Sequence, residues 1–147
     1  ASLIKIYEKL NLNSSLTMIG NDYKYLERKN YPKNKNIKII SKFSNLKELI
    51  KYYDKCDIFI LPSYVEAYPQ VILESLSRLR PIIIFNEIKY LKKTFPFGLF
   101  NCDRTPKGLR DNIIKIKKNY NKIQFQILKN KVFTLESFHR DMNKIFK

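Results

Sequence analysis

The 147-residue sequence contains little histidine and little cysteine. His139 is the only histidine, so a metal site built from several histidines has no ligands. Cys56 and Cys102 lie far apart and outside any Cys-x-x-Cys spacing. That spacing predicts reduced, partly buried thiols, as in a cytosolic setting, and gives no support to a disulfide.

Long apolar stretches are also absent. No run reaches the roughly 18 residues that span a bilayer, and residues 1–5 show no signal-peptide pattern. Hydrophobic residues still make up 44% of the chain, enough for a core. We therefore expect a single domain over residues 1–147. The sequence lacks an initial Met and opens directly on a helical pattern, from which we expect an N-terminally truncated fragment of a longer protein.

Acidic residues are scarce, with 13 Asp and Glu against 29 Lys and Arg, for a formal charge of +16. Such a charge can indicate anionic lipid, nucleic acid or an anionic substrate as a partner. However, lysine far outnumbers arginine, and Asn, Ile and Tyr are abundant too. A- and T-rich codons produce the same composition, so the charge alone leaves the partner open.

Short apolar runs alternate with amphipathic stretches along the chain. Strands are predicted at 16–19, 37–40, 58–61, 82–85 and, as a short edge strand, 98–100. Helices are predicted at 2–11, 23–30, 46–55, from Pro69 to about 79, 107–120 and within 123–147. The uniformly apolar 58–61 run is typical of a parallel strand covered on both faces. The alternation predicts an α/β, Rossmann-like fold with a mostly parallel sheet and helices on both faces.

The helix at 46–55 has a clear start signal. Asn45 can cap its N-terminus, with Glu48 three residues later as capping-box partner. Its predicted apolar stripe consists of Leu46, Leu49, Ile50 and Tyr53.

Residues 57–85 carry the strongest functional signal: a strand, a Pro-Ser turn, an acidic loop, a helix and a second strand. Ligands of parallel-sheet folds bind beyond the carboxyl ends of the strands. The loop after Leu61 should lie at that edge, and the helix that begins near Pro69 should point its phosphate-attracting N–H groups at the same space. Glu66 and Glu74 then flank a site that suits a nucleoside diphosphate sugar, whose phosphates lie between two sets of hydroxyls.

Two structural interpretations of these carboxylates stay open from spacing alone. Glu66 can cap the following helix, and Glu74 can pair with Arg78 at the i+4 position.

The segment also resembles a known family. It is similar to the donor-binding signature of GT-B glycosyltransferases, particularly the family-4 group with its Glu-x7-Glu motif. The matching positions are Asp57, Pro62-Ser63, Glu66, Tyr68-Pro69, Ile72-Leu73-Glu74 and Pro81. The resemblance implies the C-terminal half of a GT-B fold that lacks its first strand. In the family, that strand lies between those predicted here at 16–19 and 58–61.

The resemblance also implies roles. Glu66 would be the catalytic residue that positions the donor sugar, and Glu74 would hold the ribose hydroxyls. The remaining donor-binding positions would be Ser63, the backbone amides of Ala67 and Tyr68, and, near the base, Ser41 and Lys42. The family implies retention of anomeric configuration, with no metal and no cofactor besides the nucleotide-sugar substrate.

Several departures accompany the resemblance. Ala67 stands where the family usually has Gly, and Arg80 stands before Pro81 where a small residue or Gly is usual. The family's Arg and Lys that clamp the diphosphate, and its acceptor-binding domain, are not in this chain. We therefore expect the chain alone to bind donor weakly and not to turn over.

The expected parent is a retaining glycosyltransferase that transfers a hexose to a glycan or lipid-linked acceptor. It would be cytoplasmic and peripheral at the inner membrane face, where positive charge favours anionic lipid. One alternative is a basic, non-enzymatic module that binds nucleic acid or a membrane. Scattered lysines and the absence of a recognition motif argue against nucleic acid. A GT-B-like nucleotide-sugar epimerase is a further alternative.

Overall fold

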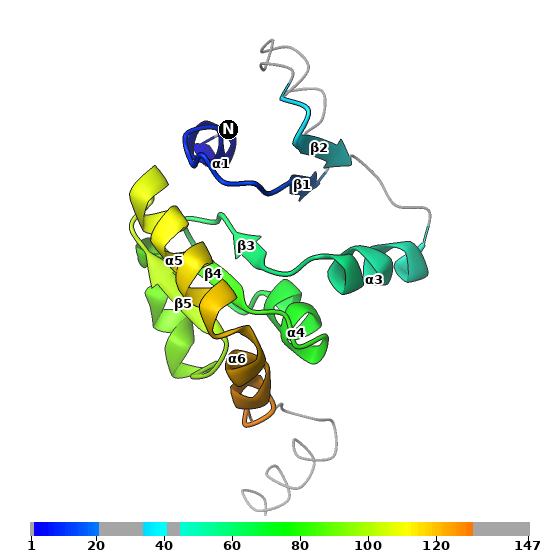
Figure 1. Cartoon of the computed structure of the whole chain (residues 1–147). Coiled ribbons are helices and arrows are strands. Elements are labelled where there is room, and N and C mark those ends of the chain that lie inside the picture. Colours follow the sequence, from blue (N-terminus) through cyan, green and yellow to red (C-terminus); the bar gives the residue numbers. More distant parts are fainter. Residues whose placement is uncertain (1, 21–33, 41–44, 131–147) are drawn as a thin grey trace, which may run out of the picture.

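The computed structural model describes residues 2–20, 34–40 and 45–130 (Figure 1). Helices and strands alternate in these residues, as predicted. The helices are α1 (Ser2–Tyr7), α3 (Leu46–Lys55), α4 (Gln70–Ser77), the 3₁₀ helix η1 (Asn86–Lys93), α5 (Pro106–Lys118) and α6 (Tyr120–Ile127). The strands are β1 (Leu16–Ile19), β2 (Ile37–Ile40), β3 (Phe59–Leu61), β4 (Ile82–Phe85) and β5 (Leu99–Cys102). The helix predicted at 23–30 and the predictions for 131–147, including His139, lie outside the described residues.

All strand pairs in the described residues are parallel, as predicted, and they form two sheets. β1 pairs with β2, and β3, β4 and β5 form a second sheet in that order. Within the described ranges, no backbone ladder joins β1 to β3. In this part of the chain, β1 and β3 each keep one edge without a strand partner, at the place where the resemblance implies a missing strand.

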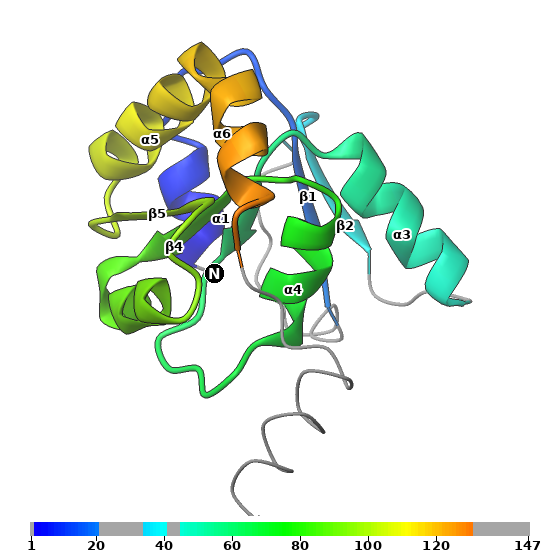
Figure 2. The same ribbon diagram turned by 90° about the horizontal axis from the view of Figure 1, so that it is seen from below.

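The hydrophobic core is centred on β4. All four of its residues, Ile82–Phe85, are fully buried, which explains why this strand is uniformly apolar. α4 packs on β4 and contributes the buried Ile72 and Leu76. α5 packs on β5 through a buried face and contacts α1 and α6. Figure 2 shows α5 and α6 side by side next to the three-stranded sheet.

Side-chain caps fix the starts of two helices. The Asn45 Oδ1 atom accepts a hydrogen bond from the Glu48 amide at 3.0 Å, as predicted. At α5, the Thr105 hydroxyl accepts from the Gly108 amide at 3.1 Å, and Pro106 occupies the first turn.

The predicted apolar stripe of α3 is covered at only one end. Tyr53 is buried, whereas Leu46 is 68% exposed and Ile50 is 37% exposed. The contacts of α3 with α4 and β3 gather at its C-terminal end, through Tyr53 and Asp54. The predicted apolar stripe is therefore buried at Tyr53 but largely exposed at Leu46 and partly exposed at Ile50.

The chain leaves α4 through a strained residue. Leu79 has a φ of 56°, and the Arg80 amide bonds to the Ser75 carbonyl while the Leu79 amide bonds to that of Leu76. This is a Schellman C-cap, whose left-handed position glycine normally occupies. The residue with the positive φ is therefore Leu79. Arg80, which stands where the family usually has a small residue or Gly, does not have one.

The two cysteines are free thiols, with Cys102 buried and Cys56 half-buried. In the parts of the chain that the structure describes, no helix has the length and apolarity required to cross a bilayer. In those same parts, no three His, Cys, Asp or Glu side chains gather closely enough to hold a metal ion.

Candidate functional site

The loops that follow β3, β4 and β5 meet at one edge of the three-stranded sheet. The parallel register pairs Leu61 with Ile84 and Phe85 with Cys102, so the carboxyl ends of all three strands coincide. The acidic loop (residues 62–68) follows β3 at this edge. η1 follows β4 there, and Asp103-Arg104 follows β5.

Glu66 is held on both its side chain and its backbone. The Ser63 hydroxyl donates to Glu66 Oε1 at 2.6 Å. The Tyr90 hydroxyl, from η1, accepts from the Glu66 amide at 3.1 Å and also hydrogen-bonds to the Glu66 carbonyl. From the described residues, Glu66 Oε2 receives no hydrogen bond. One carboxylate oxygen of a positioned side chain is therefore open to a ligand.

Arg104 anchors the start of the acidic loop. Its Nη1 and Nη2 atoms donate to the carbonyls of Pro62 and Ser63, each at 3.0 Å. Its guanidinium lies 3.9 Å from the ring centre of Tyr64 and 4.1 Å from that of Phe85. Its side chain is only 12% exposed. Arg104 therefore ties the loop to β4 and β5 by hydrogen bonds and by cation–π contacts.

Arg104 also pairs with Glu87 of η1, with 2.9 Å between Nε and Oε1. This hydrogen bond lowers the pKa of the Glu87 carboxyl. The ion pair links η1, which carries Tyr90, to the same arginine that holds the loop.

Sequence reasoning did not identify Arg104 or Tyr90. Arg104 comes directly after the apolar strand β5, a position at the same edge as the acidic loop, and this was the available signal. For η1 the signal was the i, i+3 spacing of the buried Ile88 and Leu91, which fits a 3₁₀ helix.

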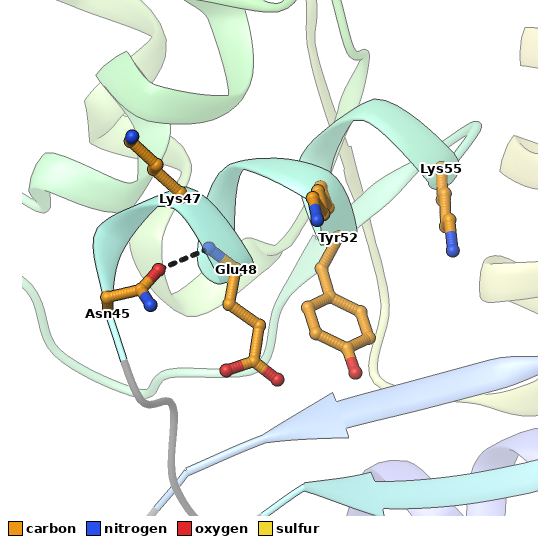
Figure 3. Close-up of a pocket in the computed structure, with 6 residues that line it drawn as sticks. Asn45, Lys47, Glu48, Tyr52 and Lys55 are labelled. Carbon is orange, nitrogen blue, oxygen red and sulfur yellow. Dashed lines mark hydrogen bonds between the residues drawn. The ribbon is translucent and has the colours of Figure 1, made fainter.

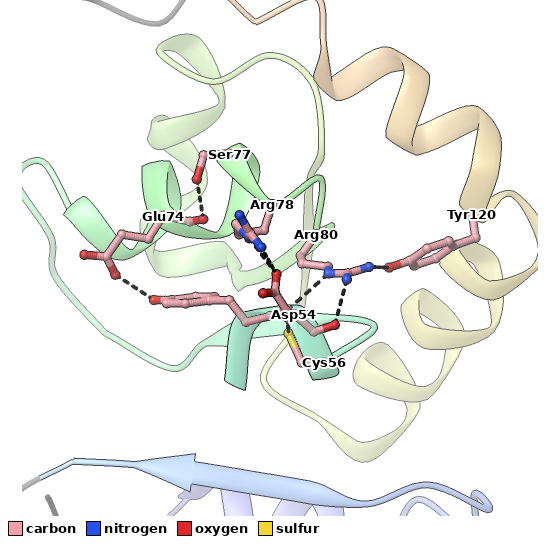
Figure 4. Close-up of polar contacts among 8 residues, drawn as sticks. Asp54, Cys56, Glu74, Ser77, Arg78, Arg80 and Tyr120 are labelled. Atoms are coloured by element: carbon pink, nitrogen blue, oxygen red, sulfur yellow. Dashed lines mark hydrogen bonds and ion pairs between the residues drawn. The ribbon is translucent and has the colours of Figure 1, made fainter. Parts of the chain in front are cut away.

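Glu74 has a different partner (Figure 4). It projects from α4, and the Tyr53 hydroxyl of α3 donates to its Oε2 at 2.8 Å. Burial and the hydrogen bond to Glu74 raise the pKa of Tyr53 above its usual value. The hydroxyl therefore stays protonated and remains a donor to the carboxylate.

Both competing interpretations of the two carboxylates are wrong. The residue at the N-cap of α4 is Pro69, and no side chain caps this helix, so Glu66 is not a helix cap. Arg78 pairs with Asp54 of α3, with 2.6 Å between Nε and Oδ1, and not with Glu74.

The other predicted site residues fall into two groups. Ala67 and Tyr68 are exposed, and within the described chain their amides donate to no protein group. The Tyr68 ring lies 5.8 Å from that of Phe95. Ser41 and Lys42 lie outside the described residues. The structure thus gathers Ser63, Glu66, Ala67 and Tyr68 in one loop and places Glu74 on the helix that follows.

Two cavities lie away from the acidic loop. One, of about 520 Å³, runs along α3 and is lined by Asn45, Lys47, Glu48, Lys51, Tyr52 and Lys55 (Figure 3). The other, of about 350 Å³, is lined by Leu79, Asn121, Gln124, Phe125 and Leu128. Neither contains Glu66 or Glu74, which lie half-buried at the sheet edge.

Comparison with known proteins agrees with this architecture. The family described as glycosyl transferases group 1 matches residues 1–131. Among solved structures, the chain resembles the C-terminal domain of a glycosyl transferase group 1 family protein, LpcC, from Francisella tularensis. The TM-score is 0.59 at 16% identity, over 88% of this chain and 71% of that one. No curated protein sequence matches the chain. The fold is therefore that of the C-terminal domain of a GT-B protein.

Proposed function

The chain belongs to the glycosyl transferases group 1 family, and we propose that it is the nucleotide-sugar-binding part of a retaining glycosyltransferase. The parent transfers a hexose to a glycan or lipid-linked acceptor. One observation carries this proposal: Glu66 is fixed by Ser63 and Tyr90 at the carboxyl ends of parallel strands, with Oε2 open. This edge is where folds of this class bind ligands.

The donor occupies the edge in an extended arrangement. Glu66 Oε2 accepts from hydroxyls of the sugar, and the amides of Ala67 and Tyr68 approach the sugar or the diphosphate. Glu74, one helical turn and more into α4, accepts from the ribose hydroxyls. Ser41 and Lys42, which follow β2 in the sequence, complete the set near the base.

Charge explains how this arrangement favours transfer. As the glycosidic bond breaks, negative charge builds on the departing diphosphate. Backbone N–H groups at the start of α4 and basic side chains stabilise that charge. Glu66 meanwhile positions the sugar, whose anomeric carbon becomes electron-poor. No metal and no further cofactor takes part. Retention of the anomeric configuration is proposed from the resemblance of the Glu-x7-Glu segment.

The division into two sheets supports the proposal that residues 1–147 are a truncated piece of a two-domain enzyme. A single parallel strand inserted between β1 and β3 would join both sheets into one. In the proposed parent, that strand and the loop after it bring the Arg and Lys that clamp the diphosphate. A separate domain binds the acceptor. The chain alone then binds donor weakly and does not turn over.

The proposed location is cytoplasmic and peripheral at the inner membrane face. The formal charge of +16 supports it, because basic residues near a membrane surface are attracted to anionic lipid.

Calorimetry with a panel of nucleoside diphosphate sugars tests the donor site in the full-length protein. Glu66→Gln and Glu74→Gln should each weaken binding about tenfold or more, since each removes hydrogen bonds to a charged group worth roughly 1.5–3 kcal/mol. Asp111→Asn, on the exposed face of α5, is the matched control and should bind as the wild type does. Unchanged affinity in both glutamate variants would overturn the proposed site.

Product analysis tests the reaction. NMR of the anomeric proton should show a new glycosidic bond with the configuration of the donor. Inversion, or an epimerised nucleotide sugar without transfer, would contradict the proposal and in the second case would identify an epimerase.

A further inference from the structure

Tyr53 connects three elements around Glu74. It projects from the last turns of α3, and its ring lies 5.6 Å from that of Phe59 on β3. Its hydroxyl reaches α4 and donates to Glu74 Oε2 at 2.8 Å. The residue is only 7% exposed. Packing against the sheet therefore fixes the position of this hydroxyl independently of Glu74.

Arg80 binds the backbone of Tyr53 at the end of α3. The last carbonyls of a helix have no partner within the helix, and at the end of α3 this arginine supplies one. Its Nε donates to the Tyr53 carbonyl at 3.1 Å, and its Nη2 to the Asp54 carbonyl at 2.7 Å. Its Nη1 bonds to the Tyr120 hydroxyl at 3.2 Å, which in turn donates to the Asp57 carbonyl at 2.8 Å. The residue before Pro81 thus joins α3, β4 and α6.

A fixed donor beside a glutamate has a consequence for ligand binding. A free glutamate side chain loses up to about 1.5–2 kcal/mol of rotamer entropy when a ligand orders it. A carboxylate accepts about four hydrogen bonds, and Tyr53 uses one of them. Glu74 Oε1 accepts no hydrogen bond from the described residues. The carboxylate is therefore ordered in advance while most of its acceptor capacity stays open.

We propose that Tyr53, anchored by Arg80, is a positioning residue that orients Glu74 toward the ribose diol of the donor nucleotide. This inference rests on the proposed function. Tyr53 does not touch the ligand; it selects the carboxylate orientation that receives the two hydroxyls. Removing its hydroxyl should weaken recognition of the ribose and leave the contacts of the base and the diphosphate unchanged.

The test compares ribose and dideoxyribose ligands on the full-length protein. Uridine, guanosine and adenosine diphosphate are compared first. The probes are the one that binds most tightly and the 2′,3′-dideoxy form of the same nucleotide. Tyr53→Phe should weaken the ribonucleotide about five- to tenfold and the dideoxynucleotide less than twofold, since loss of preorganisation costs part of a charged hydrogen bond. Tyr7→Phe on α1, which removes a tyrosine hydroxyl that donates to the Ser14 carbonyl at 2.7 Å, is the matched control and should leave both affinities unchanged.

Glu74→Gln separates this inference from the proposed function. If that variant loses the preference for ribose but Tyr53→Phe keeps it, the positioning role is overturned and the proposed site stands. If Glu74→Gln keeps the preference, the proposed ribose contact itself fails. Equal weakening of both ligands by Tyr53→Phe would mean a purely structural role and would also overturn the inference.

A second variant acts on the anchor alone. Arg80→Lys keeps the charge but cannot make the three separate N–H contacts of a guanidinium. It should weaken the ribonucleotide about two- to threefold with the dideoxynucleotide unchanged. A normal preference for ribose in this variant would show that Arg80 does not set the orientation of Glu74.

Discussion

Replacing Arg104 should release the acidic loop from the sheet. Arg104→Met keeps an apolar stem of similar length but removes the guanidinium, which is bonded to the carbonyls of Pro62 and Ser63 and sandwiched between Tyr64 and Phe85. The variant therefore loses the contacts that join the loop to β4 and to the end of β5.

The magnitude follows from those contacts. A hydrogen bond to a charged group contributes roughly 1.5–3 kcal/mol when buried. Here both carbonyls can regain water, which reduces each to about 1 kcal/mol. Each cation–π contact adds about 0.5–1 kcal/mol. The ion pair with Glu87 lies at the surface, where water screens it, and adds little to this sum. Arg104→Met should lower the free energy of unfolding by about 3–4 kcal/mol, or the melting temperature by about 9–12 °C for a chain of this size.

Urea and thermal unfolding followed by circular dichroism measure this loss. Arg110→Met, on the exposed face of α5, removes an equal charge and should stay within about 0.5 kcal/mol of the wild type. Donor affinity should fall with Arg104→Met as well, because Glu66 lies on this loop and is displaced when the loop is released. If Arg104→Met unfolds like Arg110→Met, the reasoning that this arginine anchors the loop is refuted.

Three further predictions concern single groups. Gly98→Ala should cost about 2–4 kcal/mol in urea unfolding, since Gly98 has a φ of 87° and a Cβ there would lie 2.6 Å from a side-chain carbon of α6; Gly20→Ala, which meets nothing within 4 Å, should be silent. Because the pKa of Glu87 is lowered from 4.5 in the fold, its pairing with Arg104 stabilises the protein above pH 4.5 and is lost as the pH falls through the folded value. The stability gap between wild type and Glu87→Gln should therefore close in acid titrations, and a gap that persists at pH 2 would contradict the pairing. Burial raises the pKa of the Cys102 thiol to about 11, so iodoacetamide at pH 8 should label Cys102 in mass spectra only after unfolding.

The strands and most helices could be predicted because local signals determined them. The apolar run at 82–85 becomes the fully buried β4, and the Asn45 cap forms with the predicted partner. The edge that carries Glu66 also follows from the strand order alone, since parallel strands end at a common edge.

The supports of the two carboxylates could not be predicted in the same way. Tyr90 reaches Glu66 across 24 residues, Arg104 reaches Ser63 across 41, and Tyr53 reaches Glu74 across 21. Locally, each resembles any surface tyrosine or arginine, and only the packed elements bring the groups together. The covered side of a helix is equally non-local: the apolar stripe of α3 could be predicted, but not that Leu46 at its start stays 68% exposed.

The divided sheet has a practical consequence for handling this polypeptide. An edge strand presents a row of N–H and C=O groups that can pair with another molecule. In the described ranges, β1 and β3 each have one edge that pairs with no other strand, and each edge presents such a row. Produced alone, the 147-residue chain should self-associate through these rows, and light scattering should rise with protein concentration. Lysine at the exposed Thr17 or Ile19 of β1 should suppress the rise, whereas a monodisperse monomer at high concentration would mean that these edges are already covered.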